Sequence, residues 1–532
     1  MSAWESLLLP PERVTAVTEE GAAVALTPSG GEWTDAASGV VVTTDGGEPD
    51  RLRIALRSPR IPLRRIHLRW AVPVPEGARL LGDAWERGYG DLEWRGIVPE
   101  RRMPWYFLVH VGGRTHGIGV ETGANAVVWW QADQNGVSLW LDVASGGSGV
   151  HLGDRTLDAA TVRLRVGHDA ESPFEAAIGL CRLLCPAPRL PDHIVYGFND
   201  WYYAYGNSTA ASILRDAELL HRLSPNQDNP PYQVIDAGWF HAKGCNGGPY
   251  EEGNADFPDM AGLAAQMTAL GVRPGVWIRP LLTTVDVPAA WRLPESHEAY
   301  RSAKGAVFLD PTVPEVLELV RTDIRRLVDW GYKLIKHDFT TFDLTGRWGF
   351  QMGDSLTESG WHFSDRSRTT AEIVRDLYAA IREAAGDVVL IGCNTIGHLG
   401  AGLFELQRTG DDTSGIAWER TRKMGVNTLA FRMPQHNTFF AADADCVGLT
   451  EAVPWHLNRQ WLDLLAASGT PLFVSADPKA VGPDQEAALK AAFARASLPQ
   501  PPAEPLDWLD TTCPRRWTLG RESATFHWQE EA

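Results

Sequence analysis

The chain has 532 residues, of which 44% are hydrophobic and 22% charged, and its formal net charge at pH 7 is -18. This length is too great for one ordinary domain and predicts two or three, with a sizeable core. The acidic balance argues against a nucleic-acid partner, because nucleic-acid-binding proteins neutralise phosphates with Lys and Arg. No apolar run approaches the roughly 20 residues of a membrane span, so no membrane partner is expected.

The N-terminus has no basic region ahead of its short apolar run at residues 7–9, and Pro10 and Pro11 follow that run directly. This is not the pattern of a signal peptide, so we expect a cytoplasmic protein. Free thiols are expected because a chain of this size needs no disulfides. Cysteine and histidine spacing predicts no metal site, and no metal or organic cofactor is implied. The six scattered cysteines are Cys181, Cys185, Cys245, Cys393, Cys446 and Cys513.

Apolar and polar residues alternate with a period of two through most of the first 170 residues. Leu52, Ile54 and Leu56 alternate with arginine and alanine, and residues 162–166 repeat the pattern. Such runs, separated by Gly, Asp and Pro, predict antiparallel sheets that each bury one face, and hence a β-sandwich. Residues 82–91 are rich in glycine and aromatic residues and predict a long loop. This loop either packs on itself or reaches over the site of the neighbouring domain.

The pattern changes near residue 171, where a helical run is followed by Pro186, Pro188 and Pro191. Beyond it, strand-like runs alternate with helical stripes, such as the one that begins near Pro314 and ends before Gly331. Eight such units predict a (β/α)8 TIM barrel, and therefore an α/β fold class. The expected strands lie at or within residues 198–202, 234–239, 274–278, 332–339 and 388–391, a run into Arg408, and residues 436–447 and 471–474.

A proline-rich linker at residues 499–505 follows the eighth unit, and the remainder contains a hairpin that turns near Gly520. We therefore expect three parts. They are an antiparallel β-sandwich domain over residues 1–190, a (β/α)8 barrel over 191–498 and a short C-terminal β segment over 499–532.

The fourth expected strand ends in a charged pair, Lys336 and Asp338. Residues two apart on a strand leave the same face, so the ammonium group lies beside the carboxylate and keeps it ionised. An ionised carboxylate can act as a nucleophile, and the alternative is a structural ion pair at the mouth of a barrel. A second acidic cluster, Asp411 and Asp412 after Arg408, also follows a strand-like run and favours a functional site.

These motifs, in this order, resemble a known family. Lys-x-Asp-Phe at 336–339, Gly392 and Cys393 closing the next strand, and Arg-x-Gly-x-Asp-Thr at 408–413 look like the retaining α-galactosidases of glycoside hydrolase family 36, with relatives in families 27 and 31. Tryptophans at three further strand ends extend the match over residues 190–480: Trp201, Trp239 and Trp277. In a barrel, such residues converge at the carboxyl ends of the strands.

The resemblance implies a retaining α-glycoside hydrolase, most simply an α-galactosidase, which needs two carboxyl groups with opposite roles. Asp338 would be the nucleophile. Asp412 would be the general acid/base, with its pKa raised by the partly apolar pocket and by Asp338 before the glycosyl-enzyme forms, and Asp411 is the other candidate. For Arg408 a structural salt bridge is the alternative to substrate contact. The expected substrate-binding residues are Asp236, Trp239, Lys336, Arg408, Cys393, Trp201, Trp277 and Asp200.

One position departs from the family pattern. The α-galactosidases have two aspartates before the Gly and Trp of the second strand, whereas here Asp236 is followed by Ala237. A buried hydroxyl left without an acceptor costs on the order of 1 to 3 kcal/mol, which argues against galactose as the preferred sugar. Another loop, for example at Asp200, would otherwise have to supply the missing carboxylate.

Other functions stay open from the sequence. An α-glycosidase of other sugar specificity and a raffinose-synthase-like transglycosylase share these motifs. A non-catalytic carbohydrate-binding protein would have no need for both carboxylates. In each case the expected partner is a carbohydrate, such as an α-glycoside oligosaccharide or glycoconjugate. The sequence leaves the oligomeric state open, a homo-oligomer included.

Overall fold

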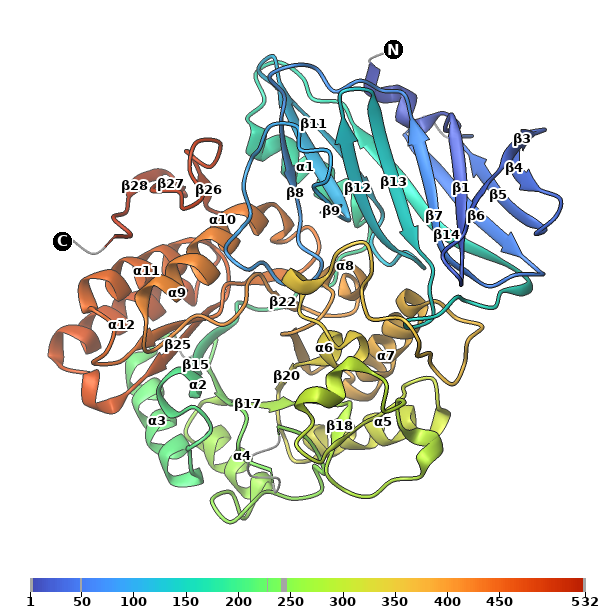
Figure 1. Cartoon of the computed structure of the whole chain (residues 1–532). Helices are drawn as coiled ribbons and strands as arrows, with labels where there is room; N and C mark the ends of the chain where they lie inside the picture. Colours follow the sequence, from blue (N-terminus) through green and yellow to red (C-terminus); the bar gives the residue numbers. More distant parts are fainter. Residues whose placement is uncertain (1–2, 48–49, 227, 241–245, 530–532) are drawn as a thin grey trace.

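The computed structural model describes residues 3–47, 50–226, 228–240 and 246–529. Its N-terminal part contains two antiparallel sheets (Figure 1). The six-stranded sheet has the order β2 (Ala23–Ala25), β1 (Arg13–Thr18), β7 (Leu63–Trp70), β13 (Gly136–Asp142), β12 (Val127–Asp133) and β9 (Met103–Pro104). The eight-stranded sheet has the order β3 (Thr27–Ser29), β4 (Glu32–Asp35), β5 (Val40–Asp45), β6 (Arg51–Ser58), β14 (Gly153–Arg165), β11 (Arg114–Val120), β10 (Tyr106–Val111) and β8 (Arg79–Gly82).

The alternating strands build a shared core between these sheets. In β6, Leu52, Ile54 and Leu56 are buried and the residues between them are more exposed. Phe107 of β10 meets Trp130 of β12 with 5.6 Å between ring centroids, so the apolar faces of the two sheets pack on each other. The predicted β-sandwich is confirmed.

The second part is a closed parallel barrel. Around it run β15 (Tyr196–Asn199), β16 (Tyr232–Ile235), β17 (Arg273–Ile278), β20 (Leu334–His337), β21 (Val389–Gly392), β22 (Leu406–Arg408), β23 (Ala441–Asp443), β24 (Cys446–Leu449) and β25 (Leu472–Ala476). β23 pairs with β22 and β24 pairs with β25, so these two are halves of one interrupted seventh strand, and β25 pairs back to β15. The predicted (β/α)8 barrel is confirmed.

Helices surround the barrel (Figure 1). In α5, Val316, Val320, Ile324 and Leu327 form one buried stripe, proline begins the helix, and Gly331 follows its end with a φ of 100°. The long barrel helices are α3 (Ala210–Leu223), α4 (Met260–Ala269), α5 (Pro314–Asp329), α7 (Thr370–Ala385), α11 (Trp455–Ala467) and α12 (Pro483–Ala496). Shorter helices follow strand ends: α2 (Trp201–Ala204), α6 (Thr340–Thr345), α8 (Gly397–Gly400), α9 (Trp418–Thr421) and α10 (Thr428–Arg432).

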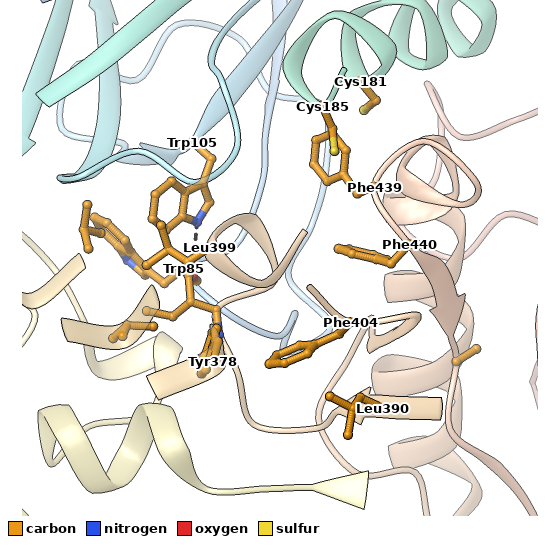
Figure 2. Packing of buried hydrophobic residues seen from close by; sticks show 14 of the residues in the cluster. Trp85, Trp105, Cys181, Cys185, Tyr378, Leu390, Leu399, Phe404, Phe439 and Phe440 are labelled. Atoms are coloured by element: carbon orange, nitrogen blue, oxygen red, sulfur yellow. Dashed lines mark hydrogen bonds between the residues drawn. The ribbon is translucent and has the colours of Figure 1, made fainter. Parts of the chain in front are cut away.

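A buried apolar cluster joins the sandwich to the barrel (Figure 2). Trp105, which follows β9, stacks on His398 of α8 with 4.7 Å between ring centroids. Its Nε1 donates to the carbonyl of Trp85 at 3.1 Å. Figure 2 shows both tryptophans beside Leu399 of the barrel. This packing fixes the loop that carries Trp85 over the barrel.

The C-terminal segment is a three-stranded sheet of β26 (Glu504–Pro505), β27 (Arg516–Leu519) and β28 (Glu522–Thr525). β27 and β28 form the predicted hairpin, which turns through Gly520 with a φ of 68°. The described cysteines are free thiols as predicted, and Cys245 lies outside the described residues. Within the described ranges, no helix has the length and apolar character needed to cross a membrane.

Candidate active site

Two adjoining cavities open at the carboxyl ends of the barrel strands. The inner one has a volume of about 60 Å³ and the outer one about 320 Å³, and Asp338, Phe339 and Asp412 line both. Asp338 follows β20 and Asp412 follows β22, and they meet because all strands of a parallel barrel end at one rim. The inner cavity is further lined by Trp201, Asp236, Ala237, Asn246, Trp277 and Lys336. The outer cavity is further lined by Arg87, Tyr89, Trp348, Phe350, Asp411 and Arg420.

Asp338 accepts three hydrogen bonds. The backbone N–H groups of Phe339 and Asn394 donate to its Oδ1 at 2.7 and 2.9 Å. Trp277 Nε1 donates to its Oδ2 at 3.1 Å. These donors stabilise the charged form of the carboxyl group and fix its orientation.

The pKa of Asp338 lies below its ordinary value. Burial opposes ionisation and is the largest single influence, but the nearby positive charges of Arg87 and Lys336 outweigh it, against a smaller opposing effect of Asp412. Asp338 is therefore ionised at neutral pH, as a nucleophile requires.

Phe339 has a left-handed backbone, with a φ of 65°. This conformation is rare for a bulky residue and persists where packing enforces it. The guanidinium carbon of Arg279 lies 4.0 Å from the centroid of the Phe339 ring, and Arg279 itself pairs with buried Asp343 at 2.6 Å. Phe339 also contacts the ring of Trp348 at 5.6 Å. The contacts of the Phe339 ring with Arg279 and Trp348 hold the Phe339 N–H toward Asp338.

Asp412 sits among cations. Arg408 Nη2 lies 3.2 Å and Arg87 Nη1 3.8 Å from its Oδ1. Desolvation raises the pKa of Asp412, but Arg408, Arg87 and Lys336 together lower it below the ordinary value. The expectation of a raised pKa is therefore wrong, because the pocket around this carboxyl group is rich in guanidinium groups rather than apolar.

The neighbouring Asp411 has a different environment. Its carboxylate pairs with Arg87 at 3.0 Å and with Arg420 at 2.7 Å. It lines the outer cavity, whereas Asp412 lines both cavities beside Asp338. This geometry favours Asp412 over Asp411 as the partner of Asp338.

The loop at residues 82–91 reaches the barrel, which decides between its two interpretations. The N–H of Gly88 donates to the carbonyl of Thr409 at 2.9 Å, and the N–H of Asp411 donates to the carbonyl of Gly88 at 2.9 Å. This pairing places Arg87 between Asp411 and Asp412. Arg87 was not among the predicted site residues. The glycine-rich and aromatic character of its loop was the sequence feature that could have indicated it.

The inner wall is organised around a buried ion pair. Lys336 Nζ donates to Asp236 Oδ2 at 2.7 Å, and Asn199 Nδ2 donates to the same oxygen at 2.8 Å. Asp236 and Lys336 line the inner cavity together with Trp201 and Trp277. These four predicted substrate-binding residues are therefore brought together.

Four other predicted substrate-binding residues line neither cavity. Trp239 is fully buried and its Nε1 donates to the carbonyl of Trp277 at 2.9 Å. Arg408 is also fully buried and pairs with Asp412 and Asp445, and Cys393 Sγ lies 3.4 Å from its Nη1. Asp200 accepts from the N–H of Asp236 at 2.7 Å and does not replace the missing second carboxylate. These side chains support the cavity wall, because the barrel core lies directly beneath the rim.

Asp445 is a second residue of the site that local sequence patterns did not indicate. It sits at the break in the seventh strand with a φ of 67° and accepts from Arg408 at 2.8 Å and from the N–H of Thr413 at 2.8 Å. The hydroxyl of Tyr202 donates to it as well. Asp445 therefore anchors the arginine that faces Asp412, and the acidic end of the seventh strand was its only sequence signal.

His337, between Lys336 and Asp338, is fully buried and structural. Its Nε2 lies 3.1 Å from Thr340 Oγ1, and burial lowers the pKa of the ring to about 3. Among the residues that the structure describes, no three His, Cys, Asp or Glu side chains form a candidate metal site.

A buried acidic cluster lies behind the inner wall. Burial raises the pKa of Asp216 to about 7 and that of Asp200 to about 6, the latter with help from Asp236. The hydroxyl groups of Tyr203 and Ser208 donate to Asp216 and Asp200 respectively. The folded protein is therefore more stable when each of these two carboxyl groups is protonated.

Replacing Asp216 with Asn should stabilise the protein at pH 8 and leave it unchanged at pH 4. A raised folded-state pKa contributes stability at low pH that is lost as pH rises toward 7, and a neutral amide escapes this loss. The expected gain at pH 8 is on the order of 1 kcal/mol or more, measured by thermal or urea unfolding at both pH values. Asp154→Asn, at an exposed position, controls for the loss of one charge. Equal changes at both pH values would contradict this account.

Comparison with solved structures finds the same fold in α-galactosidases. TtGalA, an α-galactosidase from Thermus thermophilus, matches with a TM-score of 0.63 at 19% identity over 97% of this chain and 99% of its own. The family 36 α-galactosidases AgaA and AgaB from Geobacillus stearothermophilus match with TM-scores of 0.58 and 0.59 at 14% and 12% identity, over 91% of this chain and 75% and 74% of theirs. No family model and no curated protein matches the sequence. The chain therefore has the sandwich-and-barrel fold of the glycoside hydrolase family 36 α-galactosidases.

Proposed function

We propose that this protein is a retaining α-glycoside hydrolase of α-galactosidase type. The observation that carries the proposal is the shared position of Asp338 and Asp412, which line the same two adjoining cavities. Retaining glycoside hydrolysis needs two such carboxyl groups on either side of one glycosidic bond. The fold supports the same class of substrate, because the similar structure of TtGalA is described in complex with p-nitrophenyl α-D-galactopyranoside.

In the first step, Asp338 attacks the anomeric carbon of the sugar. Its Oδ2 has one N–H donor and its Oδ1 has two, so Oδ2 is the more available nucleophile. The bond from the anomeric carbon to the aglycone oxygen breaks, and that oxygen takes a proton from the protonated form of Asp412, which the surrounding cations make the minor form at neutral pH. The product of this step is a β-linked glycosyl ester on Asp338.

In the second step, Asp412 takes a proton from water and the water oxygen attacks the anomeric carbon. The ester bond to Asp338 breaks, and the sugar leaves with its α configuration. The cations around Asp412 favour its ionised form already in the free enzyme, and esterification favours it further by removing the negative charge of Asp338; this is the form that a base needs.

The sugar would lie across the junction of the two cavities, with its hydroxyl groups directed into the inner cavity toward the Lys336–Asp236 pair. Ala237 lines this cavity and supplies no carboxylate, so the recognition of one hydroxyl group is weaker than in a site with two aspartates. A sugar other than galactose is therefore the second candidate substrate. A panel of aryl α-glycosides (galacto, gluco, xylo, manno and N-acetylgalactosamino) tests which sugar is preferred. NMR of the first product tests the retaining mechanism. An initial β-anomer would contradict the retaining mechanism.

Replacing Arg87 with Met should move the whole pH profile of kcat/KM to higher pH. Arg87 lowers the pKa of Asp338, which must be ionised, and the pKa of Asp412, which must be protonated. Both pKa values therefore increase when the charge of Arg87 is lost, and both limbs of the profile move to higher pH. We expect Arg87→Lys to restore part of the shift. Profiles measured from pH 3 to 9 for the two variants would refute this role if both limbs stayed in place.

A further inference from the structure

The outer cavity is lined by both charged and aromatic side chains. Tyr89, Phe339, Trp348 and Phe350 are four of its lining side chains. Phe350 is 62% exposed and meets Tyr89 edge to face with 4.9 Å between ring centroids. Trp348 is held in place by stacking on Phe342 at 4.6 Å. The cavity therefore presents open aromatic surface directly beside the two reacting carboxyl groups.

The polar groups of this cavity are mostly engaged with one another. The hydroxyl of Tyr89 donates to Glu86. Asp411 pairs with Arg87 at 3.0 Å and with Arg420 at 2.7 Å. A second sugar would have to satisfy its hydroxyl groups in competition with these pairs, whereas an apolar ring would leave them intact.

Resting on the proposed function, we propose that the outer cavity selects an aromatic aglycone, stacked against Phe350 and Trp348, over a second sugar. Aromatic rings gain from offset or edge-to-face contact with other rings beyond the area that they bury. The guanidinium carbon of Arg87 already lies 5.5 Å from the Trp348 ring centroid, so the wall is suited to flat, electron-rich groups. The natural substrate class would be aryl or arylalkyl α-glycosides.

The test compares aglycones that leave as alcohols of the same kind. The benzyl α-glycoside and the α-(1→6)-linked glycosyl-glucose of the preferred sugar both release a primary alcohol, so their ratio of kcat/KM reports recognition rather than leaving-group chemistry. The cyclohexylmethyl α-glycoside adds an apolar ring without π electrons. All three are measured with the wild-type full-length chain and with Phe350→Ala, Phe350→Leu and Phe350→Trp.

We expect the wild type to favour the benzyl substrate over both others. Phe350→Ala should lower the benzyl-to-disaccharide ratio by about threefold to tenfold, with Phe350→Leu intermediate and Phe350→Trp close to wild type. Because Phe350 is exposed, these variants should fold, and unfolding midpoints check this. Leu498→Ala removes another exposed apolar side chain, 52% exposed and outside both cavities, and should leave the ratio unchanged.

The inference is overturned if the wild type prefers the disaccharide, if the cyclohexylmethyl and benzyl substrates are equal, or if Phe350→Ala lowers all three rates alike. These outcomes leave the proposed hydrolase function standing. Failure of the wild type to cleave any α-glycoside would instead overturn the proposed function, and this inference with it.

Discussion

Replacing Asp338 with Ala should lower kcat on an aryl α-glycoside by about 10⁴-fold or more. Two other carboxylates line the inner cavity: Asp236 is committed to Lys336 at 2.7 Å and cannot take over as nucleophile, and Asp412 is the proposed general acid/base. Added azide should partly restore release of the aryl group in this variant. Because azide then enters where the carboxylate was, a single inversion should give the β-glycosyl azide. The measurements are steady-state kcat and the anomeric configuration of the azide product by NMR.

Two observations would contradict this role for Asp338. The first is a variant that keeps more than a few per cent of wild-type kcat. The second is an α-glycosyl azide as its rescue product. Unfolding midpoints of the Ala and Asn variants at this position serve as the folding control, since both remove the buried charge that faces Arg87 and Lys336.

Replacing Asp412 with Ala should lower kcat/KM by about 10²- to 10⁴-fold for substrates with poor leaving groups, and less for nitrophenyl glycosides. A nitrophenolate leaves without a proton, so the first step survives and the glycosyl-enzyme accumulates. Azide should then attack this β-linked intermediate and give the α-glycosyl azide, opposite to the product of the Asp338 variant. A burst of nitrophenol and NMR of the product measure both effects.

Asp411→Asn is the matched control for Asp412, because the two residues are adjacent and share contact with Arg87. We expect Asp411→Asn to keep kcat/KM within about tenfold of wild type and to show no rescue by azide. The assignment is reversed if Asp411→Asn is the variant that azide rescues and the Asp412 variant remains active.

The elements around the site could be read from local patterns. The strand before Asp338 contains the apolar pair Leu334 and Ile335 followed by charged residues, and a strand-like run leads into Arg408, so neighbouring residues alone indicate both elements. Barrel closure then brings Asp338 and Asp412 to one rim. Local patterns do not indicate how deep a side chain lies below the rim of the barrel. Arg408, Cys393 and Trp239 were therefore expected to line the cavity, whereas they are buried and do not line it.

The sequence by itself determined the sandwich, the eight strands of the barrel and the pair of aspartates at the strand ends, because periodicity and end motifs act over a few residues. Only the tertiary structure decided that Arg87 joins the site, that Asp445 anchors Arg408, and that the pKa of Asp412 is lowered. These outcomes depend on charges brought within a few ångströms of one another from distant parts of the chain. Electrostatic interactions follow distance in space, and local sequence does not record that distance.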